Sequence, residues 1–141
     1  MARNPGRPLS PHLTIWKWGP HMLVSILHRA TGVAMATGGV MLLVWWLAAV
    51  ATGPESYATF SRWMIDAEGA GGLPELTTVL AKIAAIAITW AFFQHMSTGV
   101  RHLVLDIGAG YELKTNKMYA QLTMVVSTFL TIALWGWALT R

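Results

Sequence analysis

The sequence predicts an all-α membrane protein whose three transmembrane helices form part of a hetero-oligomeric helical bundle. Of its 141 residues, 55% are hydrophobic and only 11% are charged, whereas ordinary soluble domains carry roughly 25% charged residues. Three apolar runs are each long enough, at about 1.5 Å per residue, to cross the hydrocarbon layer as a helix. Because these runs take up most of the chain, we expect one membrane-anchor domain over residues 1–141 and no separate soluble domain.

The first span is expected over residues 22–51, after a polar N-terminal segment of residues 1–21. Its uncharged part runs from residue 30 to residue 53, and the helix starts near Met22 because nothing after Pro20 forbids it. Trp45 and Trp46 lie toward the far end, where amphipathic rings favour the membrane interface.

The second and third spans are expected over residues 76–105 and 118–140. Residues 52–75 form an acidic connecting segment rich in glycine and proline, which predicts a loop. The second span is uncharged only over residues 83–100, which is just enough to cross the membrane. A short turn follows it, and the last span is uncharged until Arg141.

Basic residues indicate the orientation of these spans, because short loops rich in Lys and Arg stay in the cytoplasm. Three basic residues fall on the side of the acidic segment and the C-terminus, namely Arg62, Lys82 and Arg141. Seven fall on the other side: Arg3, Arg7, Lys17, Arg29, Arg101, Lys114 and Lys117. We therefore expect a cytoplasmic N-terminus and an external C-terminus, and the scatter of these residues gives no patch for nucleic acid.

A polar stripe in the second span is the strongest chemical signal. His95, Gly99, His102 and Asp106 follow one another at intervals of four, three and four, so they share one helical face. His95 lies about 9 Å of helix rise inside Arg101, at hydrocarbon depth, where an imidazole needs a metal or a hydrogen-bond partner. The chain has no cysteine, so haem iron is the natural metal and His95 its axial ligand. The alternative is that His95 only forms a hydrogen bond between helices.

Neighbouring cations fit the same interpretation. Arg101 and His102, nearer the surface, would pair with the anionic propionates of a haem. For Arg101, snorkelling toward the membrane surface explains the position equally well.

A second cluster lies at the cytoplasmic end of the first span. Ser25 and Arg29 are four residues apart, and Gly32 continues their stripe. A hydroxyl and a guanidinium on one face suit a quinone head group, whose oxygens accept hydrogen bonds and gain negative charge on reduction. The alternative is that Arg29 only orients the protein and Ser25 bonds to its own helix.

The histidines also predict a partner chain. A six-coordinate haem needs two axial ligands, and no other histidine lies at the depth of His95: His12 and His21 precede the membrane, whereas His28 and His102 lie near its surface. The second ligand is therefore expected from another membrane subunit.

Three stretches carry a resemblance to a known family: Arg7-Pro-Leu-Ser-Pro-His-Leu, Ser25-Ile-Leu-His-Arg-Ala-Thr-Gly32 and His95-Met-Ser-Thr-Gly-Val-Arg-His-Leu-Val-Leu-Asp106. The chain resembles, over nearly its whole length, the cytochrome b membrane-anchor subunit of succinate dehydrogenase, respiratory complex II. The N-terminal stretch is similar to the alphaproteobacterial and mitochondrial branch. The lack of a targeting presequence favours a bacterium, and hence the bacterial inner membrane with the C-terminus in the periplasm.

The resemblance implies specific roles and partners. It makes His95 an axial ligand of haem b, with the opposite ligand from a small membrane-anchor subunit, and it puts His28 and His102 near the haem propionates. It assigns Ser25 and Arg29 to the ubiquinone site. It adds a flavoprotein and an iron-sulfur subunit on the cytoplasmic side, which oxidise succinate, so this chain alone is expected to catalyse nothing.

The sequence also fits two rival functions. One is a non-redox scaffold or assembly subunit without haem, whose polar stripe only pairs helices. The other, a small transporter, is disfavoured because three spans without internal repeats lack the usual two-fold gating architecture.

Overall fold

The computed structural model describes Gly6, residues 18–66 and residues 72–140, so the first of the three quoted stretches lies outside the described residues. Within them the chain is helical and contains no strand. Its elements are α1 (Pro20–Ala34), a π-helical turn η1 (Met35–Gly39), α2 (Val40–Thr52), α3 (Pro54–Met64), α4 (Gly72–Asp106) and α5 (Leu113–Leu139). The predicted all-α class is confirmed.

Three helical segments are long and apolar enough to cross a membrane: Pro20–Thr52, Gly72–Asp106 and Leu113–Leu139. They coincide with the three predicted spans, but each begins two to five residues earlier than expected, since the expected starts were residues 22, 76 and 118. The first begins at Pro20, which suits a first helical turn because no backbone N–H is needed there. The protein is therefore a multi-pass membrane protein.

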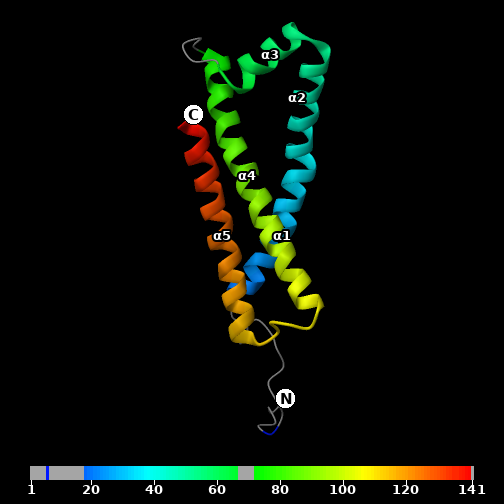
Figure 1. Ribbon diagram of the computed structural model, residues 1–141, viewed down its shortest axis with the longest axis vertical. Helices are drawn as coiled ribbons and strands as arrows, with labels where there is room; N and C mark the ends of the chain where they lie inside the picture. Colours follow the sequence, from blue (N-terminus) through cyan, green and yellow to red (C-terminus); the bar gives the residue numbers. More distant parts are fainter. Residues whose placement is uncertain (1–5, 7–17, 67–71, 141) are drawn as a thin grey trace, which may run out of the picture.

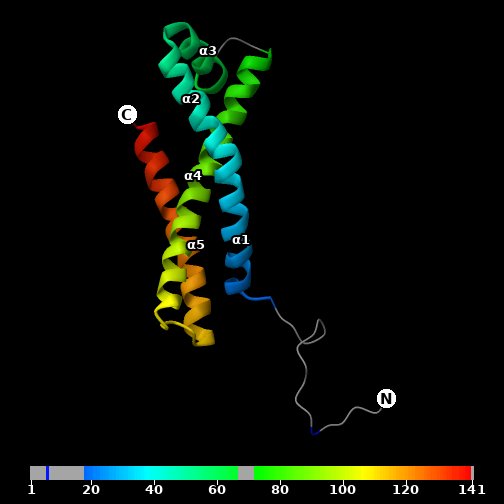
Figure 2. The ribbon, with the colours of Figure 1, turned by 90° about the vertical axis from the view of Figure 1, so that its right-hand side faces the viewer.

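The spans alternate in direction. Figures 1 and 2 show the start of α1, the end of α4 and the start of α5 gathered at one end of the molecule, with α3 and the C-terminus at the other. Helix α4 is the central element, since it contacts α1, α3 and α5. The two polar clusters of the sequence consequently lie at the same end, on neighbouring helices.

Helix α3 corrects the prediction that residues 52–75 form a loop. It bridges α2 and α4 at the end of the molecule far from α1 (Figure 1). The proline and acid that suggested a loop are helix-start residues here: Pro54 opens the first turn, which contains Glu55, and Arg62 lies in the last turn. Phe60 is buried and packs edge-to-face on Trp45, with ring centroids 5.2 Å apart.

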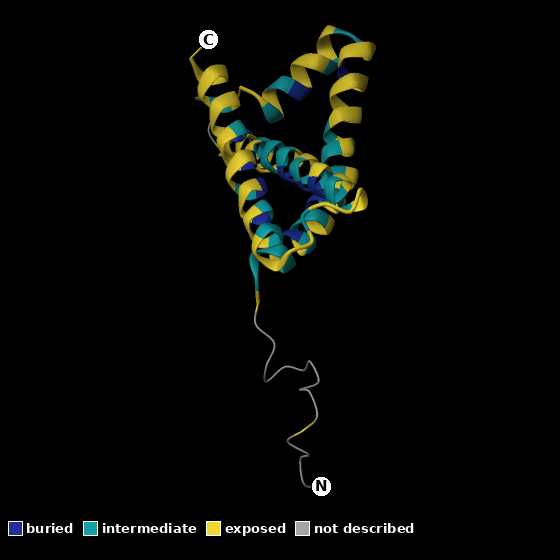
Figure 3. Ribbon diagram, turned by 60° about the horizontal axis from the view of Figure 1, so that its bottom comes forward, coloured by how far each residue is buried: buried dark blue, intermediate teal, exposed yellow. Residues whose placement is uncertain are grey.

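The interior of this fold is more polar than its surface. Figure 3 shows buried positions only where helices meet, while the outward faces are exposed. Large apolar side chains such as Met41 and Val125 are exposed, as lipid-facing residues are. The buried polar side chains are Thr31, Thr78, Gln94, Thr98, Arg101, Thr123, Ser127 and Thr131. Of these, Gln94 and Arg101 form hydrogen bonds between helices, and such bonds help to hold helices together where apolar packing gains nothing over lipid.

Candidate functional site

The imidazole of His95 reaches from α4 to the backbone of α1. Its Nδ1 atom lies 3.0 Å from the carbonyl oxygen of His28 and 3.3 Å from Oγ1 of Thr31. Thr31 is itself held, because its hydroxyl contacts the carbonyl oxygen of Leu27 at 2.7 Å. His95 therefore joins the two helices and is oriented by both.

These contacts determine which ring nitrogen carries the proton. A carbonyl oxygen only accepts, so Nδ1 of His95 must be the donor to His28. In a neutral imidazole the other nitrogen, Nε2, is then deprotonated and carries a free lone pair. No hydrogen bond to Nε2 occurs within the part of the chain that the structure describes. This lone pair is chemically able to bind a metal. The described residues contain no group of three or more His, Asp or Glu that would hold a bare metal ion.

Two further histidines extend this cluster, one against His95 and the next against His28. His28 stacks on His95, with ring centroids 3.8 Å apart and planes inclined by 10°. His102 meets the ring of His28 edge-on, with centroids 5.1 Å apart. The Nδ1 atom of His28 is buried without a hydrogen-bond partner. Since a stacked ring covers the face of an imidazole, His28 does not block the in-plane direction of Nε2.

The remainder of the predicted stripe on α4 is open. Gly99 has no atom within 4 Å of the position a β-carbon would take, and Asp106 is exposed. Helix α1 therefore covers this stripe near His95 and His102, whereas the positions of Gly99 and Asp106 are open. This open edge is suited to a partner chain or a flat macrocycle.

Ser25 and Arg29 face the same space, as their spacing predicted. The guanidinium of Arg29 donates to Oγ of Ser25 over 3.3 Å, and this pair is exposed. Next to Arg29 lies a shallow apolar hollow of about 520 Å³, whose other lining residues are Ile26, Ala30, Val33 and Ala34. A cation, a hydroxyl and an apolar surface thus adjoin on the outer side of α1.

Arg101 lies apart from the histidines, although the sequence placed it among them. It is buried on the face of α4 that meets α5, where its guanidinium donates to Oδ1 of Asn116. His102, the next residue, points instead toward His28 on α1. The structure thus brings His28, His95 and His102 together but does not bring Arg101 to them.

A fully buried glutamine next to His95 was missed by sequence reasoning. Gln94 donates to Thr98 over 3.0 Å and to Thr123 over 3.4 Å, and it accepts from Ser127 over 2.7 Å. Gln94, Thr98 and Ser127 have no exposed surface. This network joins α4 to α5 and so turns the next residue, His95, toward α1. The sequence did offer a signal for this residue, because Gln94 is an amide within the uncharged residues 83–100 of the second span.

A known protein family matches the chain over most of its length. The succinate dehydrogenase/fumarate reductase transmembrane subunit family matches the chain over residues 3–134. The chain belongs to this family. The chain is 36% identical to the succinate dehydrogenase cytochrome b556 subunit of Rickettsia felis, over 92% of this chain and 90% of the relative.

Other relatives of this transmembrane subunit carry similar names. The cytochrome b556 subunit of Paracoccus denitrificans is 31% identical over 89% of this chain and 87% of its own length. The human mitochondrial cytochrome b560 subunit is 34% identical over 80% of this chain and 59% of its own length. The resemblance to a succinate dehydrogenase membrane-anchor subunit is therefore confirmed.

Proposed function

We propose that this subunit anchors succinate dehydrogenase in the membrane, holds haem b through Nε2 of His95 and helps to form the site of ubiquinone reduction. The hydrogen bond from Nδ1 of His95 to the His28 carbonyl carries the proposal. A ligating histidine nearly always donates its other ring nitrogen to such an acceptor, which sets the tautomer and raises the basicity of the ligand.

The residues around His95 fit a haem. Haem b supplies a one-electron centre inside the membrane when it is bound. His28 stacks on His95, and His102 meets His28 edge-on. Both would pair with the haem propionates, which also gives the unpartnered Nδ1 of His28 an acceptor. Arg101 was also expected to pair with the propionates. Its guanidinium bonds to Asn116 on α5, so pairing with a propionate stays a prediction.

Ser25 and Arg29 would bind the ubiquinone head group. Both carry hydrogen-bond donors and lie on α1 close to His28, and Arg29 carries a positive charge. A cation next to a quinone oxygen stabilises the negative charge that develops on reduction. The apolar hollow at Ile26 and Val33 offers a surface for the ring or the tail.

The proposal requires partner subunits. Because this chain would supply one axial ligand of the haem, the second would come from a small membrane-anchor subunit. That subunit would cover the open edge at Gly99. An iron-sulfur subunit and a flavoprotein subunit would dock at the Ser25 end and deliver electrons from succinate. The basic residues of that end favour the cytoplasmic side of a bacterial inner membrane, with the C-terminus in the periplasm.

Haem ligation is tested by His95→Ala in the assembled complex, with His21→Ala as the matched control at the start of α1. The pyridine haemochrome spectrum should show loss of haem from His95→Ala and full occupancy in the control. An unchanged haem content and axial ligand field in His95→Ala refutes the assignment. A complex without any haem bands in the parent protein supports the rival scaffold function.

The quinone site is tested by Ser25→Ala and Arg29→Ala, with Arg62→Ala at the opposite end as the control. Both variants should impair ubiquinone reduction, whereas succinate oxidation with an artificial acceptor stays normal. Losing one hydrogen bond from a charged donor removes about 1.5–3 kcal/mol, so Arg29→Ala should lower kcat/KM for ubiquinone at least about tenfold. Unchanged quinone reduction in both variants rules this site out.

A further inference from the structure

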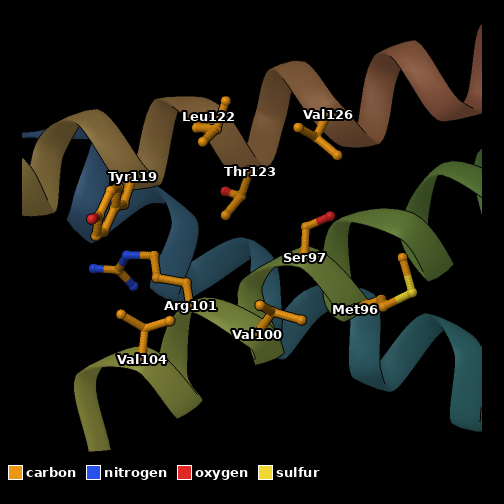
Figure 4. A pocket seen from close by; sticks show the side chains of 9 residues that line it. All are labelled: Met96, Ser97, Val100, Arg101, Val104, Tyr119, Leu122, Thr123 and Val126. Carbon is orange, nitrogen blue, oxygen red and sulfur yellow. The ribbon is translucent and has the colours of Figure 1, made fainter. Parts of the chain in front are cut away.

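A second, unassigned groove lies between α4 and α5. Its volume is about 440 Å³, and Figure 4 shows its lining: Met96, Ser97, Val100, Arg101 and Val104 from α4, with Tyr119, Leu122, Thr123 and Val126 from α5. Val104 is nine residues, about two and a half turns, beyond His95, so the two point in opposite directions. The groove is therefore separate from the proposed haem and quinone sites.

One end of the groove holds an uncompensated cation. Arg101 is only 7% exposed, and its Nε atom is buried without a hydrogen-bond partner. Its hydrogen-bonded partner, Asn116, is a neutral amide, and residues 1–17 contain no acidic side chain that would supply an anion. Because a buried charge is costly unless it is paired, this guanidinium favours an anionic ligand.

We propose that the groove binds one anionic phospholipid, with its phosphate at Arg101 and an acyl chain along the apolar wall. Tyr119 lies at the same end as Arg101 (Figure 4) and adds a hydroxyl donor. From Val104 to Met96 the wall extends for about 12 Å of helix rise, in the direction from the membrane surface toward its middle. An acyl chain fits this direction, and a phosphate supplies the negative charge that a neutral quinone oxygen does not.

Native mass spectrometry of the detergent-washed complex tests this assignment, with phosphatidylglycerol and phosphatidylcholine of identical acyl chains as probes. The parent complex should retain phosphatidylglycerol in preference to phosphatidylcholine. Arg101→Gln should weaken retention at least about tenfold, the effect of one lost charge-assisted hydrogen bond. The matched control is Lys117→Gln, which removes an exposed charge near the same end without lining the groove and should retain the lipid.

A second variant keeps the test decisive if Arg101→Gln does not assemble. Val126→Trp fills the apolar end of the groove and leaves Arg101 intact, and it should also release the lipid. Equal binding of the two lipids, equal losses in Arg101→Gln and Lys117→Gln, or ubiquinone in place of lipid overturns the proposal. Haem content and quinone reduction are separate readouts, so their loss or survival does not decide this question.

Discussion

A β-carbon on Gly32 would lie only 3.0 Å from Cε1 of His95. The missing side chain at Gly32 is therefore what lets the imidazole rest against α1, one turn beyond the carbonyl oxygen that it contacts. Gly32 continues the stripe of Ser25 and Arg29, but the structure gives it a role toward His95.

Gly32→Ala should push the imidazole away by a few tenths of an ångström and strain its hydrogen bond to His28. Overpacking of this kind costs roughly 1–3 kcal/mol. We expect retained haem with altered electron paramagnetic resonance g-values, and a lower melting temperature of the complex. Gly136→Ala is the control, because nothing lies within 4 Å of its β-carbon position. Identical spectra for both variants would contradict the close approach.

Thr31→Val should change the haem without releasing it. The substitution keeps the shape of the side chain but removes the oxygen that lies 3.3 Å from Nδ1 of His95, while the His28 carbonyl remains. Because such acceptors raise the basicity of a ligating imidazole, the midpoint potential of the haem should rise. Redox titration measures it, and Thr37→Val, whose hydroxyl bonds only within its helix, should leave it unchanged.

Gln94→Leu should loosen α5 from α4. It removes two hydrogen bonds between the helices, to Thr123 and from Ser127, and each such bond contributes on average about 0.6 kcal/mol in a membrane. We expect a loss of about 1–2 kcal/mol in the free energy of unfolding, measured by titrating the complex with a denaturing detergent. The control is Thr89→Val, which loses only a hydrogen bond to Ala85 within α4. An equal loss of unfolding free energy in Thr89→Val would mean that helix propensity, and not the contact between helices, explains the result for Gln94→Leu.

Val33→Trp should weaken ubiquinone binding if the hollow beside Arg29 receives the ring or the tail. The bulky ring fills the hollow without altering Arg29, so KM for ubiquinone should rise while kcat changes little. Met41→Trp is the matched control, since Met41 is 71% exposed and does not line the hollow. A normal KM in Val33→Trp would place the apolar part of the quinone elsewhere.

The absence of cysteine makes the orientation directly testable. Glu55→Cys on α3 and Lys114→Cys at the start of α5 introduce single thiols at exposed positions of opposite ends. In intact cells a membrane-impermeant maleimide should label Glu55→Cys, and only permeabilised cells should yield labelled Lys114→Cys. The reverse pattern would invert the proposed topology.

Much of this protein was predictable from the sequence because its spans and their charges are local properties. A run of apolar residues must satisfy its own backbone hydrogen bonds in lipid, so it becomes a helix whatever its neighbours. The spacing of His95, Gly99, His102 and Asp106 then gives a shared face, and the pairing of Ser25 with Arg29 follows from one turn of helix. The helix α3 was missed because its start residues also occur in loops.

Tertiary structure alone decided which partner each polar face meets. The tautomer of His95 depends on a carbonyl oxygen 67 positions earlier in the chain, and no local pattern specifies that contact. Likewise, Arg101 and His102 are neighbours in sequence, yet one meets α5 and the other α1, because consecutive residues on a helix point about 100° apart. The hydrogen bond between Gln94 and Ser127 helps to fix the rotation of α4 about its own axis. That rotation turns Arg101 toward α5 and His102 toward α1.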